Sequence, residues 1–130
     1  MRERVRDARV ARLATADAAG RPHLVPFSFV LEGDELLSAV DAKPKSSRRL
    51  RRLENVRANP AVSVLVDHYE EDWSRLWWVR VEGRAEVLEP GIRAERALDL
   101  LAGKYEQYRA SRPGGPVLSI HAERWSGWAP

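Results

Sequence analysis

Short runs of β-branched and aromatic residues, each bounded by turn residues, constrain the fold of this chain more than any other sequence feature. They predict strands over 12–17, 22–31, 35–40, 61–67, 76–88 and 117–124, with turns at 18–20 and 32–34. Helical spacing is confined to 47–58 and 92–108, and a charged stretch over 2–10 predicts a short opening helix. Because strands and helices do not alternate strictly, we expect a mainly antiparallel sheet closed into a small barrel, with helices at its ends.

The length and composition exclude several classes of protein. The chain has 130 residues, which suits one domain, 1–130, with a single core. It has no cysteine, which excludes disulfides, thiol nucleophiles and cysteine-ligated metals. The three histidines lack metal-ligand spacing, so no metal site is predicted. No apolar run reaches membrane-spanning length and no signal peptide opens the chain, so we expect a cytoplasmic protein without a membrane partner.

Two residues interrupt otherwise regular strand patterns. Pro26 lies inside the 22–31 run and cannot donate a ladder hydrogen bond. It therefore marks an edge strand, a bulge, or a place where something other than a strand meets the backbone. Gly83 interrupts the 76–88 run and predicts a bulge there.

The segment from Lys43 to Arg57 has a strong sign bias, because seven of its 15 residues are basic and Glu54 is its one acid. Leu50 and Leu53 share one face of the expected helix, and the opposite face is expected to carry Arg48, Arg51, Arg52 and Asn55. A helix start flanked by lysine and serine suits a phosphate. The alternatives are a solvated amphipathic helix and nucleic-acid binding through 48–57. The net charge of only +3 and the acidic run at 70–72 weigh against nucleic acid.

Five tryptophans are concentrated in two short stretches, at 73–78 and 125–128. The adjacent Trp77 and Trp78 must point to opposite faces of one strand, so one packs inward while the other faces a cleft or a subunit. Such a wall suits a flat ligand such as a flavin, although for any single tryptophan core and interface packing is the better explanation. Nothing supplies an acid–base pair, so no catalytic residue is assigned and the reactive atoms would belong to a cofactor.

Four stretches, in this order, resemble the pyridoxamine-phosphate-oxidase-like split β-barrel superfamily. They are Arg12-Leu-Ala-Thr-Ala-Asp-Ala-Ala-Gly-Arg-Pro-His-Leu-Val-Pro-Phe, Gly33-Asp-Glu-Leu-Leu, Asn59-Pro-Ala-Val-Ser-Val-Leu-Val-Asp and Val81-Glu-Gly-Arg-Ala-Glu-Val. Four others are similar to an actinobacterial subgroup assigned to the deazaflavin coenzyme F420, namely Asp41-Ala-Lys-Pro-Lys, Val66-Asp-His-Tyr, Leu76-Trp-Trp-Val-Arg and Arg124-Trp-Ser-Gly-Trp. The resemblance implies a six-stranded antiparallel split barrel that forms a homodimer, with cofactor sites at the interface.

The resemblance also implies roles by position. The cofactor-binding residues would be Val25, Pro26, Phe27, Ser28, Lys43, Lys45, Ser47, Arg48, Arg49, Arg52, Trp78 and Trp128. Residues 25–28 would lie along the ring system, Lys45, Arg49 and Arg52 would contact phosphate, and Trp78 would sit beside the ring. Trp128 would close the site from the second subunit.

The implied function is hydride transfer between F420 and a small organic acceptor. The alternatives are an FMN-dependent oxidase or reductase and a flavin- or deazaflavin-binding protein without turnover. FMN-binding relatives usually carry a compact Ser-Arg-Lys after the third strand, whereas this chain has the longer Lys43-Pro-Lys-Ser-Ser-Arg-Arg, which weighs against FMN.

Overall fold

The computed structural model describes residues 1–40 and 47–130, and the side chains of residues 47–50 also lie outside that description. Most of the described chain is strand, with helices at its margins. The elements are α1 (Arg2–Asp7), β1 (Ala11–Ala16), β2 (Pro22–Phe27), β3 (Val30–Glu32), β4 (Glu35–Ala39), α2 (Ser47–Ala58), β5 (Ala61–His68), η1 (Trp73–Arg75), β6 (Trp77–Leu88), α3 (Ile92–Lys104), α4 (Glu106–Ala110) and β7 (Val117–Trp128). The mainly β architecture with flanking helices is therefore confirmed.

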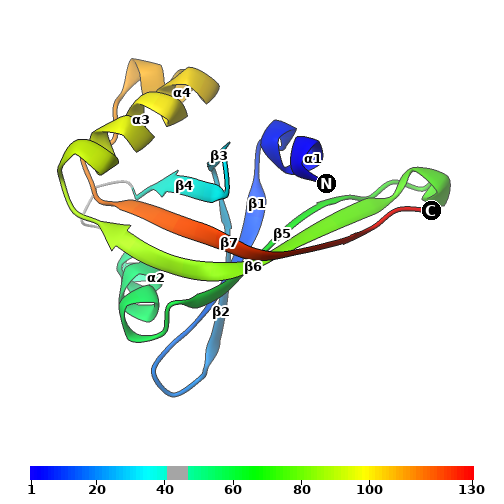
Figure 1. The fold of residues 1–130 in the computed structure, drawn as a ribbon, viewed down its shortest axis with the longest axis horizontal. Coiled ribbons are helices and arrows are strands. Elements are labelled where there is room, and N and C mark those ends of the chain that lie inside the picture. The colour runs from blue at the N-terminus through cyan, green and yellow to red at the C-terminus, as the bar shows by residue number, and fades with distance from the viewer. Residues whose placement is uncertain (41–46) are drawn as a thin grey trace.

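One antiparallel sheet contains all seven described strands, in the order β2-β1-β5-β6-β7-β4-β3. Its two end strands are consecutive in the chain and are separated by Ser28 and Phe29 alone. The sheet therefore curls until both of its edges meet in one segment, 22–32 (Figure 1). Gly20 and Gly33, in the two turns beside this segment, have φ values of 83° and 60°, which glycine adopts without strain.

The prediction of six strands is wrong, because the run expected as one strand over 22–31 is divided. Side chains replace ladder partners at the division, Ser28–Phe29, which we call the strand switch. Ser38 Oγ donates to Ser28 O at 2.7 Å, and Lys104 Nζ donates to Phe29 O at 2.9 Å. Phe29 N donates to the Tyr105 hydroxyl at 3.1 Å. The backbone can leave one edge of the sheet and join the other because these side chains satisfy its polar groups.

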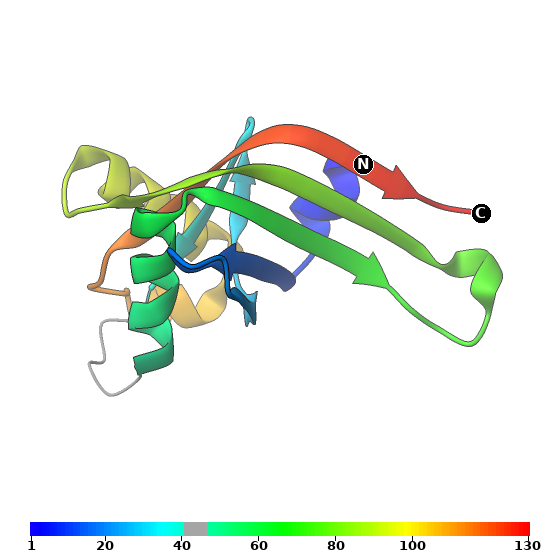
Figure 2. The same ribbon diagram turned by 90° about the horizontal axis from the view of Figure 1, so that it is seen from below.

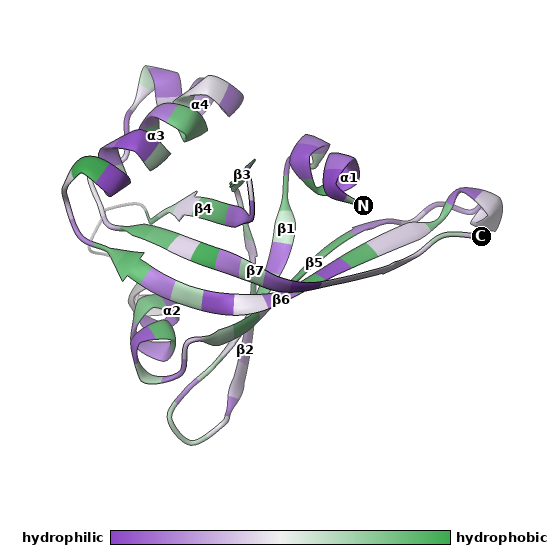
Figure 3. Ribbon diagram, in the orientation of Figure 1, coloured by the Kyte–Doolittle hydropathy of each residue, from purple (hydrophilic) through white to green (hydrophobic). Residues whose placement is uncertain are grey.

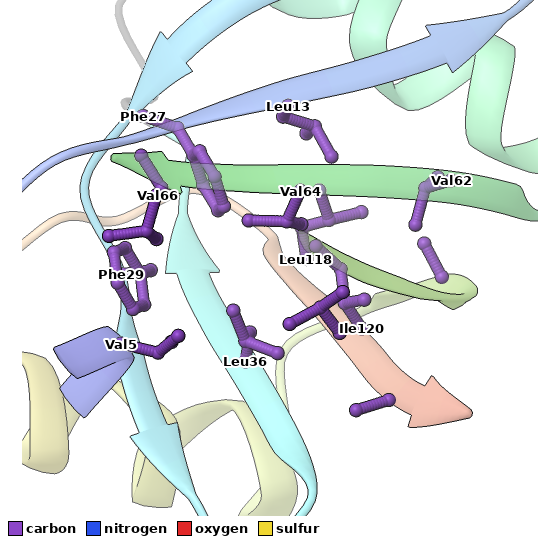
Figure 4. Packing of buried hydrophobic residues seen from close by; sticks show 14 of the residues in the cluster. Val5, Leu13, Phe27, Phe29, Leu36, Val62, Val64, Val66, Leu118 and Ile120 are labelled. Atoms are coloured by element: carbon purple, nitrogen blue, oxygen red, sulfur yellow. The ribbon is translucent and has the colours of Figure 1, made fainter. Parts of the chain in front are cut away.

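The main core fills the inside of the curl. Alternate residues of β1 and β5 point inward, as the buried Leu13, Val62, Val64 and Val66 show (Figure 4). Phe29 and Ile120 complete the packing from the strand switch and β7. A second cluster lies between β4, β7 and α3, where α3 buries Ala94, Ala97, Leu98 and Leu101, as its helical spacing predicts.

The helix predicted over 92–108 is two helices. It ends at Lys104, since Tyr105 has extended backbone angles of φ −116° and ψ 121°, and α4 begins at Glu106. The Tyr105 hydroxyl, which spacing places on the apolar face, meets the strand switch. Its contacts hold the backbone there while the chain turns into α4.

Helix α2 has the predicted bounds but not the predicted polar face. Leu53 and Val56 are buried, as is Asn55, which was expected on the opposite, exposed face. Asn55 Nδ2 donates to the buried Thr15 Oγ1 at 3.0 Å. This hydrogen bond compensates the burial of both polar groups, so the apolar face of α2 is wider than the leucines alone indicate.

Strands β6 and β7 are each 12 residues long, and with β5 they extend beyond the barrel (Figure 2). Hydrophilic and hydrophobic residues alternate along β6, as expected where one face packs on the core (Figure 3). The predicted bulge is confirmed by a register shift between Glu82 and Gly83. A Cβ on Gly83 would lie 2.1 Å from His121 O, so no side chain fits there.

The last strand extends past the predicted end at residue 124, because β7 continues to Trp128. We call the projecting ends of β5, β6 and β7, with the loop 69–76 between the first two, the arm. None of the helices in the described part of the chain has the length and apolar character needed to cross a bilayer.

Candidate functional site

A cleft of about 440 Å³ opens at the strand switch, and we call it the seam cleft. Its walls come from the end of β2, the end of β4, helix α2 and the segment 107–114. Those walls contain Pro26, Phe27, Ser28, Ser38, Ala39, Val40, Arg52, Gln107, Tyr108, Ser111, Arg112, Pro113 and Gly114. The structure thus brings four predicted site residues, Pro26, Phe27, Ser28 and Arg52, to one place.

Strand β2 contributes a sheet edge to the seam cleft. It ends the strand order and, among the described strands, pairs with β1 alone, and Pro26 lies opposite Arg12 in that pair. An edge strand presents alternate peptide groups without a ladder partner, and proline is tolerated there because it needs no donor. Of the three interpretations of Pro26, the edge strand is confirmed.

Two arginines line the seam cleft in different electrostatic settings. Arg112 Nη2 lies 2.7 Å from Glu95 Oε2 and 2.9 Å from Asp99 Oδ1, and the hydrogen bonds to these carboxylates raise the pKa of Arg112. Its charge is therefore balanced by α3. Arg52 enters from α2, whose twelve residues include four other arginines and one acid, Glu54. Among the described residues, Arg52 is the one that α2 contributes to the lining of the cleft.

The other predicted residues of this region are placed differently. Val25 packs against the main core and does not line the seam cleft. Ser47, Arg48 and Arg49 belong to the first turn of α2, but their side chains are outside the described part of the structure. Lys43 and Lys45 lie outside the described residues altogether, so their contact with a phosphate stays a prediction.

The second group of predicted residues gathers on the arm, around a hollow of about 430 Å³ that we call the arm slot. Its lining consists of Asp67, His68, Tyr69, Leu76, Trp77, Trp78 and Trp128. Trp78 is the Cα partner of both Asp67 on β5 and Trp128 on β7, so these three residues share one face of the sheet.

Trp77 points to the opposite face from Trp78, as the strand geometry predicts. It packs against the main core, and its ring stacks on His68 with 6.4 Å between centroids. The Arg4 guanidinium lies 4.8 Å from the centre of the Trp77 ring. Trp77 is therefore a packing residue, and Trp78 is the one that faces the sheet's outer surface.

The loop of the arm is acidic, and His68 and Arg75 balance part of its negative charge. His68 Nε2 contacts Glu70 Oε2, and Arg75 Nε lies 3.4 Å from the same oxygen. The hydrogen bond from His68 is the main reason that the pKa of Glu70 lies below its usual range. Asp72 accepts hydrogen bonds from the backbone and hydroxyl of Ser74, which start η1.

Among the described residues, the seam cleft and the arm slot share no lining residue. The projecting ends of β5, β6 and β7 point away from α2, β4 and α4, which border the cleft (Figure 1). The structure therefore does not bring Arg52 and Pro26–Ser28 together with Trp78 and Trp128 within one chain. Sequence reasoning also missed the wall formed by Gln107, Tyr108 and Arg112. A polar helix end gives no local sign that it borders a cleft.

Comparison with known protein sequences gives two matches. The family model for pyridoxamine 5'-phosphate oxidase matches residues 1–129. A 5a,11a-dehydrotetracycline/5a,11a-dehydrooxytetracycline reductase from Streptomyces rimosus is 36% identical over 86 residues, which are 65% of this chain and 59% of the reductase. The chain thus spans less than two thirds of that relative.

Solved structures agree with the fold. A FAD-binding protein from Mesorhizobium loti has a TM-score of 0.72 and 27% identity, over 97% of this chain and 89% of that one. A conserved hypothetical protein from Mycobacterium tuberculosis has a TM-score of 0.76 and 24% identity, over 98% of this chain and 81% of that one. The second likeness concerns the fold alone.

Proposed function

This chain belongs to the pyridoxamine 5'-phosphate oxidase family, and we propose that it is an oxidoreductase that transfers hydride between coenzyme F420 and a small organic acceptor. The observation that carries the proposal is the seam cleft, where a sheet edge and a cationic helix meet. The FAD-binding neighbour and the reductase among the relatives support redox chemistry on this fold. The choice of F420 as the cofactor rests on the resemblance of four stretches of this chain to the F420 subgroup.

The residues present fit a phosphorylated ring cofactor. At about 440 Å³ the seam cleft falls within the range of small-molecule sites. Arg52 supplies a planar guanidinium that suits a phosphate, and Lys45 would add a second cation. The edge strand β2, which ends at Phe27, would supply peptide groups for the polar edge of a ring. Gln107 and Tyr108 add donors from the opposite wall.

The chain's own part in catalysis is to bind, to orient and to exclude water. F420, when bound, supplies the hydride chemistry. Pro26 and Phe27 shape an apolar wall on one side, and Arg52 fixes the anionic end on the other.

We also propose that the working unit is a homodimer. The outward face of β1, β2 and β5 carries exposed apolar residues, because Leu24 is 67% and Leu65 38% exposed, with Pro22 and Pro26 nearby and Arg12 between Pro26 and Leu65. A second copy docked on this face would cover it. It would also carry its own Trp128 toward the seam cleft, which that residue cannot reach within its own chain.

Titration of purified protein with oxidised F420 tests the proposal, with cofactor fluorescence as the readout. We expect Arg52→Ala combined with Lys45→Ala to weaken binding by more than about tenfold, the loss expected for about 1.4 kcal/mol. Arg51→Ala is the matched control, because Arg51 is exposed on the same helix and does not line the cleft. Equal affinities for the double variant and the control would refute the phosphate assignment.

FMN is the second candidate cofactor, and the FAD-binding neighbour at 27% identity favours it. A protein that purifies yellow and releases FMN on denaturation would select FMN over F420. Turnover is then tested with each reduced cofactor and a panel of organic acceptors. Binding without turnover for any acceptor would support a carrier in place of an enzyme.

A further inference from the structure

Two indole rings lie side by side at an open edge of the arm. Trp78 and Trp128 are Cα partners on β6 and β7, so both project from the same face. β4 pairs with β7 only as far as His121, and beyond Ala122 the described part of β7 pairs with β6 alone. Trp128 is consequently 48% exposed, and Tyr69 at the other rim of the slot is 65% exposed. Large rings left in water in this way mark a binding surface.

The lining of the slot contains one carboxylate, Asp67, and the loop beside it is acidic. Asp67 lies opposite Trp78 in the β5–β6 ladder, and it forms no ion pair with any described residue. Residues 67–75 contain four carboxylates, Asp67, Glu70, Glu71 and Asp72, against the single cation Arg75, which gives a net charge of −3 with His68 neutral. This local charge is opposite in sign to the +3 of the whole chain.

The rings already face cations elsewhere on the arm. The Arg80 guanidinium lies 5.4 Å from the centre of the Trp78 ring, and Arg2 lies 4.8 Å from that of Trp125. A cation over an indole face is attracted by the negative charge density of the ring. Trp128 has no such neighbour among the described residues, so its face is open to a cationic ligand.

We propose that the arm slot binds the hydride acceptor, and that this acceptor is a planar aromatic molecule with a positive charge. Its rings would stack on Trp128 and Tyr69, and its charge would lie opposite Asp67. The inference rests on the proposed function, in which the arm of one copy approaches the seam cleft of the other. The slot then places a flat ligand beside the cofactor ring while the phosphate lies at Arg52.

Binding to the purified protein without any cofactor tests the inference separately from the proposed function. The protein is titrated separately with proflavine, a planar three-ring cation, and with anthracene carboxylate, a planar three-ring anion. We expect proflavine to bind at least about tenfold more tightly, and Asp67→Asn to weaken proflavine about fivefold while leaving the anion unchanged or improved. Glu71→Gln is the matched control, because Glu71 belongs to the same loop but does not line the slot.

Trp128→Ala is expected to weaken both probes, and Trp128→Phe to restore most of the affinity because an aromatic face remains. Equal affinity for the two probes, or equal losses in Asp67→Asn and Glu71→Gln, would overturn the proposal. Failure of F420 to bind, with proflavine still sensitive to Asp67, would overturn only the proposed function. F420 binding without proflavine binding would overturn only the acceptor site.

Discussion

The seam cleft and the arm slot are built by different means. The cleft is enclosed by elements distant in sequence, and side chains such as Asn55, Lys104 and Tyr105 hold its surroundings through hydrogen bonds. The slot follows from ladder register alone, which aligns Asp67, Trp78 and Trp128 across three neighbouring strands. Substitutions near the cleft should therefore change stability, whereas substitutions in the slot should change binding and leave stability nearly intact.

The largest effect is expected at the junction between the two regions. Gly83 lies at the bulge where β6 and β7 pass from the barrel into the arm, and a Cβ there would meet His121 O at 2.1 Å. Gly83→Ala should lower the free energy of unfolding by about 3 kcal/mol, since backbone atoms must move. Thermal unfolding measures this, with Gly103→Ala as control because nothing lies within 4 Å of a Cβ there. Equal melting temperatures for the two variants would contradict the packing argument.

A smaller loss is expected at the strand switch. Tyr105→Phe removes the hydroxyl that accepts from Phe29 N and lies 2.9 Å from Arg9 O. Leaving that N–H without a partner should cost about 1–3 kcal/mol. Tyr108→Phe is the control, because the Tyr108 ring packs edge-on against Tyr105 while its hydroxyl has no hydrogen-bond partner among the described residues. Chemical denaturation compares the two; a loss in Tyr108→Phe as large as in Tyr105→Phe would argue against the switch.

The pH dependence of stability should also report on the strand switch. Burial, with a smaller contribution from the charge of Arg9, lowers the pKa of Lys104 to about 8. Below about pH 8, Lys104 is protonated in both the folded and the unfolded chain. Between about pH 8 and the ordinary lysine pKa of 10.5, Lys104 keeps its proton in the unfolded chain but loses it in the folded chain. The Lys104 contribution to the free energy of unfolding should therefore rise with pH between about 8 and 10.

Denaturation at several pH values checks this slope, and Lys104→Met should flatten it. Above about pH 10 the raised pKa of Tyr105, which burial causes, should reverse the trend, because the unfolded chain then loses the phenol proton first. A slope unchanged by Lys104→Met would show that another group titrates.

The smallest change in stability is expected in the arm. Trp128 is 48% exposed, so Trp128→Ala should lower the free energy of unfolding by less than about 1 kcal/mol. The same variant should weaken F420 binding by the dimer, since Trp128 would close the cofactor site of the second copy. Thermal unfolding and cofactor titration on one sample separate the two effects. A large loss of stability with unchanged F420 binding would contradict the expectation that substitutions in the slot change binding and leave stability nearly intact.

Much of the fold follows from short-range patterns in the sequence. The bulge at Gly83, the edge position of Pro26 and the opposite orientations of Trp77 and Trp78 need only strand geometry. The division at Ser28–Phe29 does not, because it depends on Lys104 and Tyr105, which join the strand switch only after the whole chain has folded. Asn55 is similar, because its burial becomes favourable through Thr15 on another element.

The same distinction between local and long-range signals applies to the residues of the candidate site. Arg52 and residues 26–28 could be predicted because charge bias and a strand-breaking proline are local signals. The wall at Gln107, Tyr108 and Arg112 could not, because its position depends on how α3 and α4 pack against the sheet. The separation of Trp128 from the seam cleft within one chain also could not be predicted from the sequence, since it follows from the direction in which the arm projects.

The continuous segment 22–32 has a consequence for the order of folding. Hairpins β1–β2 and β3–β4 close over short loops, so each can form early, and the strand switch joins them into one unit. This unit must then pair with β5 through β1 and with β7 through β4, both across long sequence separations. We therefore expect the slow step of folding to be the pairing of this unit with β5 and β7. Both new ladders must close in register together, because one covalent segment fixes the spacing between them.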